Sequence, residues 1–242
     1  MADNIKERLE LVEERIEAAC RRSGRKREEI TLMGVTKFHP LERIEAAWKG
    51  GVRLFGESRV KEGIEKYTGF WQSHPRDGKT ELHLIGTLQR NKAKAAAAFY
   101  DCIQSVDRDS LIEELGILTA DRKPPLMIML EYHTGEDTKS GYTSIDDLCV
   151  AAEKVLSFPG LKPAGLMTMA PLSGDQDIIR PAFRKLLRAR DELEKRFPRS
   201  SGSNEQPWSC LSMGMTGDFE IAIEEGSTMI RIGTLLFGEK KV

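Results

Sequence analysis

Eight short apolar segments, each followed by a turn and a helix-favouring stretch, constrain the fold of this chain more than any other feature of its sequence. They cover residues 31–36, 53–55, 81–85, 102–105, 126–130, 163–168, 208–212 and 229–232. Each segment is mostly apolar throughout rather than alternating, which is typical of parallel strands covered on both faces. Eight strand–helix repeats predict an α/β fold, a single (β/α)₈ TIM barrel formed by residues 1–242 as one domain.

An additional helix is predicted before the first strand. Apolar residues recur there at three- and four-residue steps and so share one helix face: Ile5, Leu9, Val12, Ile16 and Ala19. A doubly wound open sheet is the competing architecture, but the glycine-rich first turn of that fold is absent here. The low-complexity segment 200–204 is expected to be a flexible loop.

Composition excludes several classes of function. The chain has 37 Lys and Arg against 38 Asp and Glu, so it carries no basic excess that would indicate nucleic acid or an anionic membrane as a partner. No apolar run approaches the ~20 residues of a membrane span, and the charged start lacks the apolar centre of a secretory signal. The 4 cysteines are widely spaced, which disfavours a metal site and indicates reduced thiols in a cytoplasmic protein.

A lysine follows the first predicted strand directly, in the stretch LMGVTKFHP at residues 32–40. Functional groups of a barrel lie at the carboxyl ends of its strands, so Lys37 should lie at the barrel mouth. Partial desolvation there would lower the pKa of its amine and allow attack on an aldehyde to form a Schiff base. A solvated lysine at a strand end is the alternative, and the rest of the sequence has to decide between them.

Two glycine-bearing loops follow the seventh and eighth predicted strands. The first contains Ser212 and Gly214, and the second contains Gly233 and Thr234. Hydroxyl groups and backbone N–H groups in such loops can bind phosphate oxygens, and barrels often bind phosphate after strands seven and eight. Ordinary turns would have the same composition, so these loops alone do not identify a site.

Closure of the barrel would place the lysine beside the phosphate loops. A ligand that carries both an aldehyde and a phosphate, such as pyridoxal 5′-phosphate (PLP), would fit this pair of features. Arg231 precedes the second loop and could reach the pyridine nitrogen. Because a guanidinium only donates hydrogen bonds, it would leave the ring unprotonated and a poorer electron sink.

The sequence resembles the YggS/PROSC family of pyridoxal phosphate homeostasis proteins over essentially its whole length. The matching segments are GVTK at 34–37, FGE at 55–57, HLIGTLQRNK at 83–92, SVDR at 105–108, KSG at 139–141, GLM at 165–167, LSMGM at 211–215 and RIGT at 231–234. Their number and order make the resemblance specific. It implies a fold type III PLP-binding barrel like the barrel half of alanine racemase.

The resemblance also implies roles for individual residues. Lys37 would carry PLP as a Schiff base, Ser212, Gly233 and Thr234 would contact the phosphate, and Arg231 would lie near the ring nitrogen. Members of the family have no established catalytic reaction and are regarded as carriers or regulators of the intracellular PLP (vitamin B6) pool. We therefore expect a monomeric binding protein that delivers PLP to PLP-dependent apoenzymes, not an enzyme.

Two positions depart from the pattern of the family. Ser58 stands where relatives often carry Asn, and His133 stands near another such Asn. Both positions should face the cofactor, so Ser58 is included in the expected cofactor site.

Two enzymatic functions remain as alternatives. A PLP-dependent amino acid racemase could use Tyr132 or His133 as its second acid/base, and a cofactor-free aldolase could use Lys37 on sugar phosphates. The remaining candidates have simpler interpretations. We expect His83 to be a packed core residue, and Met167 and Met169 to fill the barrel.

Overall fold

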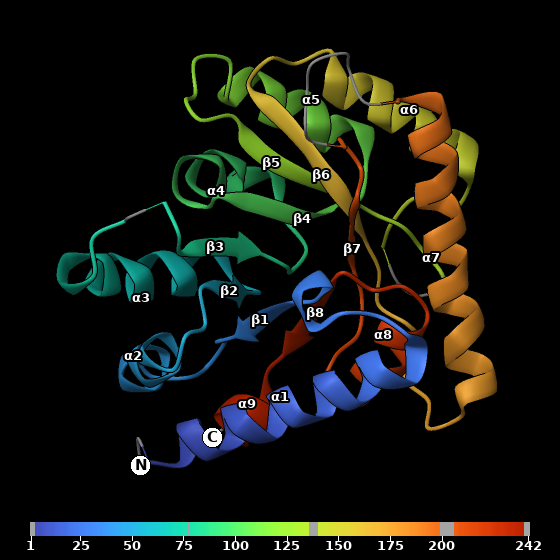
Figure 1. Ribbon diagram of the computed structural model, residues 1–242. Helices are drawn as coiled ribbons and strands as arrows, with labels where there is room; N and C mark the ends of the chain where they lie inside the picture. Colours follow the sequence, from blue (N-terminus) through green and yellow to red (C-terminus); the bar gives the residue numbers. More distant parts are fainter. Residues whose placement is uncertain (1–2, 77, 136–139, 199–205, 240–242) are drawn as a thin grey trace.

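A closed barrel of eight parallel strands in chain order forms the centre of the molecule (Figure 1). This computed structural model describes residues 3–76, 78–135, 140–198 and 206–239, so the segment 200–204 and Lys139 of the KSG motif lie outside the described residues. The strands are β1 (Thr31–Val35), β2 (Leu54–Glu57), β3 (Glu81–Leu84), β4 (Cys102–Val106), β5 (Leu126–Glu131), β6 (Leu161–Met167), β7 (Cys210–Ser212) and β8 (Met229–Ile232). The predicted TIM barrel is confirmed.

Helices follow the strands and cover the outside of the barrel (Figure 1). They are α2 (Leu41–Lys49), α3 (Val60–Ser73), α4 (Ala93–Phe99), α5 (Asp109–Leu118), α6 (Ile145–Leu156), α7 (Gln176–Arg196), α8 (Phe219–Glu224) and α9 (Thr234–Phe237). Short 3₁₀ turns, η1 (Arg27–Glu29) and η2 (Arg90–Lys92), precede β1 and α4. The predicted additional helix, α1 (Asp3–Ser23), comes before the barrel and ends where Gly24 adopts a φ of 67°.

The core consists of two layers because each strand sends alternate side chains to opposite faces. Inside the barrel lies a small cluster of buried residues: Met33, Leu54, Cys102, Met129, Met167 and Met229. Met169 packs against it, so both methionines expected to fill the barrel lie at its interior. Gly56 lies beside this cluster, where a Cβ would come within 2.6 Å of the Met33 sulfur and displace that side chain. A much larger apolar layer joins the outer face of the barrel to the helices.

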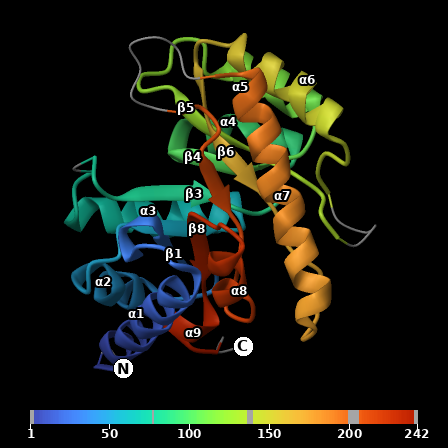
Figure 2. The ribbon, with the colours of Figure 1, turned by 45° about the vertical axis from the view of Figure 1, so that its right-hand side comes forward.

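Helix α1 lies beside α8 and α9, close to β8 in both ribbon views (Figures 1 and 2). Val12 and Ile16 of its apolar face are fully buried. Arg15 pairs with Glu220 of α8 at 3.1 Å and holds the two helices together. The first helix of the chain therefore packs against its last elements.

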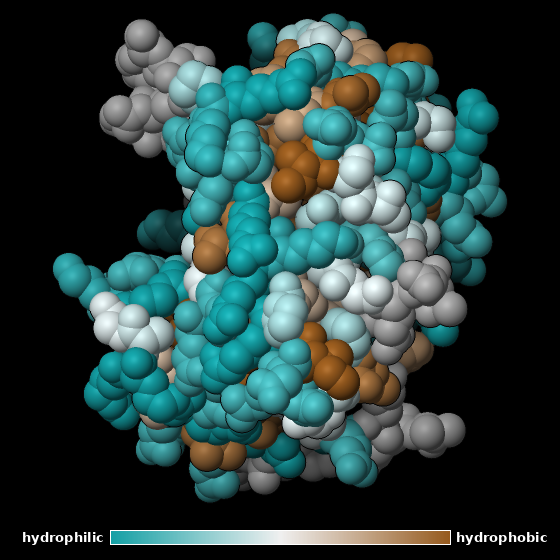
Figure 3. All heavy atoms as spheres, turned by 90° about the vertical axis from the view of Figure 1, so that its right-hand side faces the viewer, coloured by the Kyte–Doolittle hydropathy of each residue, from teal (hydrophilic) through white to brown (hydrophobic). Residues whose placement is uncertain are grey.

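The long helix α7 covers the side of the barrel formed by β6 and β7 (Figure 2). Its outer face is largely hydrophilic, and the apolar atoms there form separate small patches (Figure 3). Within the described parts of the chain, no helix combines the length and the apolar character that crossing a bilayer requires.

Candidate functional site

A cavity of about 250 Å³ opens at the carboxyl ends of the strands. Its walls are Val35, Lys37, Ser58, Ile85, Met167, Met169, Met215, Thr216, Gly217, Arg231, Gly233 and Thr234. Five of the seven residues expected to bind the cofactor are among them: Lys37, Ser58, Arg231, Gly233 and Thr234. The fold therefore brings the lysine after β1 and the loop after β8 to a single cavity.

Lys37 is half-buried in a sharp turn between β1 and α2. The next residue, Phe38, adopts a φ of 64°, a left-handed conformation that is strained for an aromatic residue. Its backbone N–H donates to Glu62 Oε1 at 2.6 Å, and its ring lies 4.7 Å below the Arg59 guanidinium. The His39 N–H closes the turn by donating to the Thr36 carbonyl at 3.0 Å. These contacts fix the direction in which Lys37 leaves the strand.

A buried ion pair lies directly behind that turn. Lys66 of α3 donates to Glu57 Oε1 at 2.7 Å and to the Thr36 carbonyl at 2.7 Å. The Thr36 hydroxyl donates to the same carboxylate oxygen at 2.7 Å and lies 3.0 Å from the Tyr67 hydroxyl. Burial raises the pKa of Glu57, although the Lys66 ammonium acts in the opposite direction. The FGE motif thus supplies a support for the lysine turn rather than a wall of the cavity.

Arg231 brings a buried cation to the lining of the cavity. Only 3 % of the residue is exposed, and desolvation lowers the pKa of its guanidinium to about 10 although Asp218 and Glu131 raise it. The guanidinium donates to the Ser212 hydroxyl at 2.9 Å and to the Thr168 carbonyl at 2.8 Å. Neither of these acceptors carries a formal charge, so an acceptor atom of a ligand in the cavity would add to its stabilisation.

The other two predicted site residues lie behind the wall. Ser212 is fully buried, and its hydroxyl accepts from Arg231 and donates to Gln104. Gly214 has a φ of 95° and lies against α8, where a Cβ would come within 2.6 Å of the Ala222 Cβ. Its carbonyl accepts from the Arg231 N–H. Both residues therefore support the wall that Arg231 forms.

The loop after β7 contributes residues that the sequence did not single out. Met215, Thr216 and Gly217 line the cavity in place of Ser212 and Gly214. Asp218 stands at the N-cap position of α8, but its carboxylate accepts from the Met215 N–H at 2.6 Å and so shapes this loop. The signal available in the sequence was the TG pair directly after the MGM turn, because a glycine beside a hydroxyl residue is typical of loops that approach a ligand closely.

The candidate acid/base residues lie elsewhere. His133 was expected to face the cofactor, but neither it nor Tyr132 is among the residues that line the cavity. The His133 N–H instead donates to the Tyr142 carbonyl at 2.8 Å, and Tyr132 is buried in the outer apolar layer below the Lys185 ammonium. His83 is buried as expected, with 2 % of the residue exposed.

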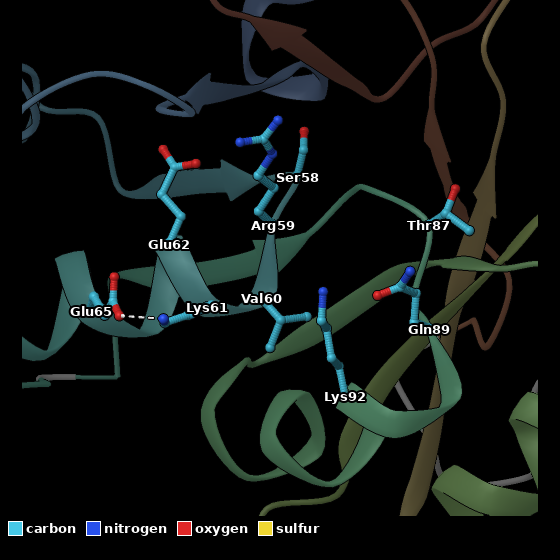
Figure 4. A pocket seen from close by; sticks show the side chains of 9 residues that line it. All are labelled: Ser58, Arg59, Val60, Lys61, Glu62, Glu65, Thr87, Gln89 and Lys92. Atoms are coloured by element: carbon cyan, nitrogen blue, oxygen red, sulfur yellow. Dashed lines mark ion pairs between the residues drawn. The ribbon is translucent and has the colours of Figure 1, made fainter.

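A larger groove of about 520 Å³ adjoins the cavity and shares Ser58 with it. Figure 4 shows that it lies between the start of α3 and the segment that carries Thr87, Gln89 and Lys92. Its basic and acidic side chains are mixed, and Lys61 pairs with Glu65 at 3.7 Å. Its open, polar walls contain no aldehyde-reactive group other than exposed lysines, so the smaller cavity is the better candidate site.

The chemistry of the cavity fits PLP. A volume of about 250 Å³ is small for a ligand pocket and suits a single ring with short substituents. Lys37 supplies a primary amine, Arg231 supplies hydrogen-bond donors, and Thr216 and Thr234 supply hydroxyl groups. The described residues contain no group of three or more His, Cys, Asp or Glu side chains arranged to hold a metal ion.

Comparisons with known proteins agree with the fold. The family model of the alanine racemase N-terminal domain matches residues 8–241. A pyridoxal phosphate homeostasis protein of Aquifex aeolicus is 38 % identical over 238 residues, which cover 98 % of this chain and 99 % of the relative. The protein of the same name from Vibrio cholerae is 35 % identical over 238 residues, 98 % of this chain and 97 % of the relative.

Solved structures extend the comparison. A protein of unknown function from Bifidobacterium adolescentis is 33 % identical, with a TM-score of 0.87 over 98 % of this chain and 95 % of the other. PipY of Synechococcus elongatus, solved with PLP bound, is 31 % identical, with a TM-score of 0.79 over 97 % of this chain and 100 % of the other. An alanine racemase of Clostridium difficile shares only the fold, at 12 % identity and a TM-score of 0.76 over 99 % of this chain and 58 % of the other. This chain belongs to the pyridoxal phosphate homeostasis protein family, which has the fold of the alanine racemase N-terminal domain.

Proposed function

We propose that this protein binds PLP and acts in PLP homeostasis, holding the cofactor reversibly on Lys37. The Lys37 amine would condense with the aldehyde of PLP to form a Schiff base and release one water molecule. Ser58, Arg231, Gly233 and Thr234 would bind the rest of the cofactor, together with Thr216 and Gly217. Ser212 and Gly214 would act from behind, by holding Arg231 in place.

One observation carries this proposal: an amine and a buried guanidinium line the same small cavity, although they lie at opposite ends of the sequence. An arginine at the ring nitrogen would donate a hydrogen bond and leave that nitrogen unprotonated. The relatives named as homeostasis proteins and the PLP-bound structure of PipY support the same ligand.

Replacement of Lys37 tests the proposal. Wild-type protein incubated with PLP should show a visible absorption band, and borohydride reduction should leave a pyridoxyl adduct on Lys37 alone, detectable by peptide mass spectrometry. Lys37→Ala should lose both signals, whereas Lys92→Ala, a lysine of the neighbouring groove, should keep both. A Lys37→Ala protein with an unchanged band would refute the assignment.

A role in delivery is the second part of the proposal. We propose that the protein is a cytoplasmic monomer that passes PLP to PLP-dependent apoenzymes and has no turnover of its own. The open mouth of the barrel supports release, since the cavity lies at the ends of the strands. Size-exclusion chromatography tests the oligomeric state, and activation of a PLP-dependent apoenzyme by the loaded protein tests delivery.

A PLP-dependent racemase is the alternative. Its weakness is that neither Tyr132 nor His133 is among the residues that line the cavity, so no second acid/base from that segment faces Lys37. Incubation of the loaded protein with a single amino acid enantiomer in D₂O should leave the Cα proton in place. Rapid exchange that disappears in Tyr132→Phe or His133→Gln would establish the enzymatic function instead.

A further inference from the structure

A chain of hydrogen bonds crosses the interior of the barrel from β3 to β8. Arg231 donates to the Ser212 hydroxyl at 2.9 Å, and Ser212 donates to Gln104 Oε1 at 2.7 Å. The Gln104 amide nitrogen lies 2.8 Å from His83 Nδ1, and His83 Nε2 lies 3.0 Å from Glu81 Oε2. The chain therefore begins at the floor of the proposed cofactor cavity and ends at the carboxylate that starts β3.

Its central members are excluded from solvent. Gln104 and Ser212 are fully buried, and His83 and Arg231 expose 2 % and 3 % of their surface. They occupy inward-facing positions among methionines and cysteines of the barrel interior. Since an unsatisfied polar group in such surroundings is destabilising, each member depends on its neighbours for a partner.

The donors and acceptors impose one direction on the chain. A guanidinium has no acceptor, so the Ser212 oxygen must accept from Arg231 and turn its own proton towards the Gln104 carbonyl. The amide nitrogen of Gln104 then donates to His83 Nδ1. His83 must therefore carry its proton on Nε2, from where it donates to Glu81. The hydrogen bond from His83 is the main cause that lowers the pKa of Glu81.

We propose that Gln104 and His83 are positioning residues for Arg231. Through Ser212, they fix one edge of the guanidinium, while the Thr168 carbonyl fixes the other. The guanidinium is thereby held with its remaining donors towards the cavity, where an acceptor nitrogen of an aromatic ring would be recognised. This inference rests on the proposed function, because the ring that Arg231 receives is that of the bound PLP.

A break in the chain should loosen Arg231 without touching the cavity wall. Gln104→Met keeps a long side chain in the barrel but removes both the acceptor for Ser212 and the donor for His83. The Ser212 hydroxyl can then rotate, so of the two side-chain hydrogen bonds that hold the Arg231 guanidinium, the one to the Thr168 carbonyl stays firm. We expect the dissociation constant for PLP to rise about tenfold in this variant. A change of that size follows from the loss of one hydrogen bond to a charged group.

A double-mutant cycle separates positioning from general damage. PLP affinity would be measured by absorbance titration for wild type, Gln104→Met, Arg231→Leu and the double variant. If Gln104 acts through Arg231, its replacement should change the affinity by less than about twofold once Arg231 is absent. Ser105→Ala is the matched control, because it removes a buried hydrogen bond of the same strand to the Gly86 carbonyl outside the chain, and it should leave the affinity unchanged. Equal losses of affinity in both backgrounds would overturn the proposal.

A second measurement needs no cofactor. Nitrogen-15 NMR of the ligand-free protein at neutral pH should show the His83 proton on Nε2, and Gln104→Met should change the Nδ1 chemical shift. If Gln104→Met does not fold, Ser212→Ala can replace it. This variant breaks the same chain one step nearer to Arg231 and should weaken PLP binding in the same way. A proton on Nδ1 in the wild-type protein would overturn the direction of the chain. Failure of wild-type protein to bind PLP, with the NMR result intact, would instead reject the proposed function.

Discussion

Glu57 places a carboxylate where solvent does not reach it. Its side chain has no exposed surface, and one oxygen, Oε1, accepts from both Lys66 and Thr36. The second oxygen, Oε2, has no hydrogen-bond partner among the described residues. Burial therefore raises the pKa of this carboxyl above its ordinary value even beside an ammonium group.

The sign of the resulting pH dependence can be predicted. Because folding raises the pKa of Glu57, the native state binds this proton more tightly than the unfolded state does, and the contribution of Glu57 to stability falls as pH rises above about 4.5. Glu57→Gln lacks this titration. We expect the variant to be less stable than wild type at pH 4.5, with a deficit that shrinks as pH rises through the raised pKa. Urea unfolding of both proteins between pH 4 and 8 measures the difference in their free energies of unfolding. A deficit that grows with pH would contradict the prediction.

At the residue scale, the sequence identified the reactive groups more reliably than the supporting ones. Lys37 and Arg231 could be selected because each stands at a strand end, where barrels place their functional groups. Ser212 carries the same kind of hydroxyl as Thr234, and only the structure shows that it faces Gln104 inside the barrel. The missed signal was one polar residue among the apolar inward residues of each of β3, β4, β7 and β8: His83, Gln104, Ser212 and Arg231.

Helix α3 positions the lysine turn from outside the barrel. Its Lys66 and Glu62 contact the backbone of Thr36 and Phe38, and Lys66 also joins Glu57 to this cluster. The turn would otherwise relax from the left-handed conformation of Phe38, which is unfavourable for a bulky residue. The helix thus acts on the proposed site without lining the cavity next to Lys37.

Replacement of Lys66 should expose this dependence. Lys66→Met leaves the Glu57 carboxylate buried without its cation, and breaking a buried pair in this way costs about 3–5 kcal/mol. We expect that loss in the free energy of unfolding, together with slower formation of the visible PLP band. Lys61→Met on the same helix is the matched control, since its exposed pair with Glu65 should be worth less than ~0.5 kcal/mol. Similar losses of stability for both variants would show that the buried pair has no special role.

The apolar face of helix α1 should contribute strongly to stability. Ile16 is fully buried against the barrel, and Leu11 on the same helix remains 45 % exposed. Ile16→Ala should lower the free energy of unfolding by about 2–5 kcal/mol, because it leaves a cavity at the contact with the last elements of the chain. Leu11→Ala should change it by less than ~1 kcal/mol, as judged by chemical denaturation. Equal effects would mean that α1 does not depend on this apolar face.

The elements themselves could be predicted better than their ends. Every predicted strand is present, because continuous apolar runs separated by helical patterns are a strong local signal. The observed strand ends differ from the predicted ones where tertiary contacts determine them. Strand β2 extends to Glu57, which bonds to α3, and β7 begins only at Cys210. A register between strands depends on contacts far apart in sequence, so periodicity along one segment could not supply it.

For the whole molecule, one closed barrel predicts one cooperative unit. The single-domain organisation therefore stays a prediction that unfolding can test. Tryptophan fluorescence reports on the surroundings of Trp48, Trp71 and the fully buried Trp208, and far-UV circular dichroism reports on all helices. The two transitions should coincide in urea. Two separated transitions would indicate that the chain unfolds as more than one unit.

Ligand binding should stabilise that whole unit. PLP at a hundred times its dissociation constant adds about 2.7 kcal/mol to the free energy of unfolding, which corresponds to a rise in melting temperature of about 5–10 °C for a chain of this size. Lys37→Ala should lose most of this shift, whereas Lys92→Ala should keep it. An equal shift in both variants would show that Lys37 does not contribute to binding.

The cavity joins two distant parts of the polypeptide, since Lys37 is synthesised long before the segment from Arg231 to Thr234. Lys37 therefore leaves the ribosome long before the residues that complete its surroundings have been synthesised. A nascent or prematurely terminated chain would hold half of a ligand site, so vitamin B6 cannot guide the early stages of its folding. Cofactor capture becomes a late event, available only after the residues of β8 and the loop behind it have been made.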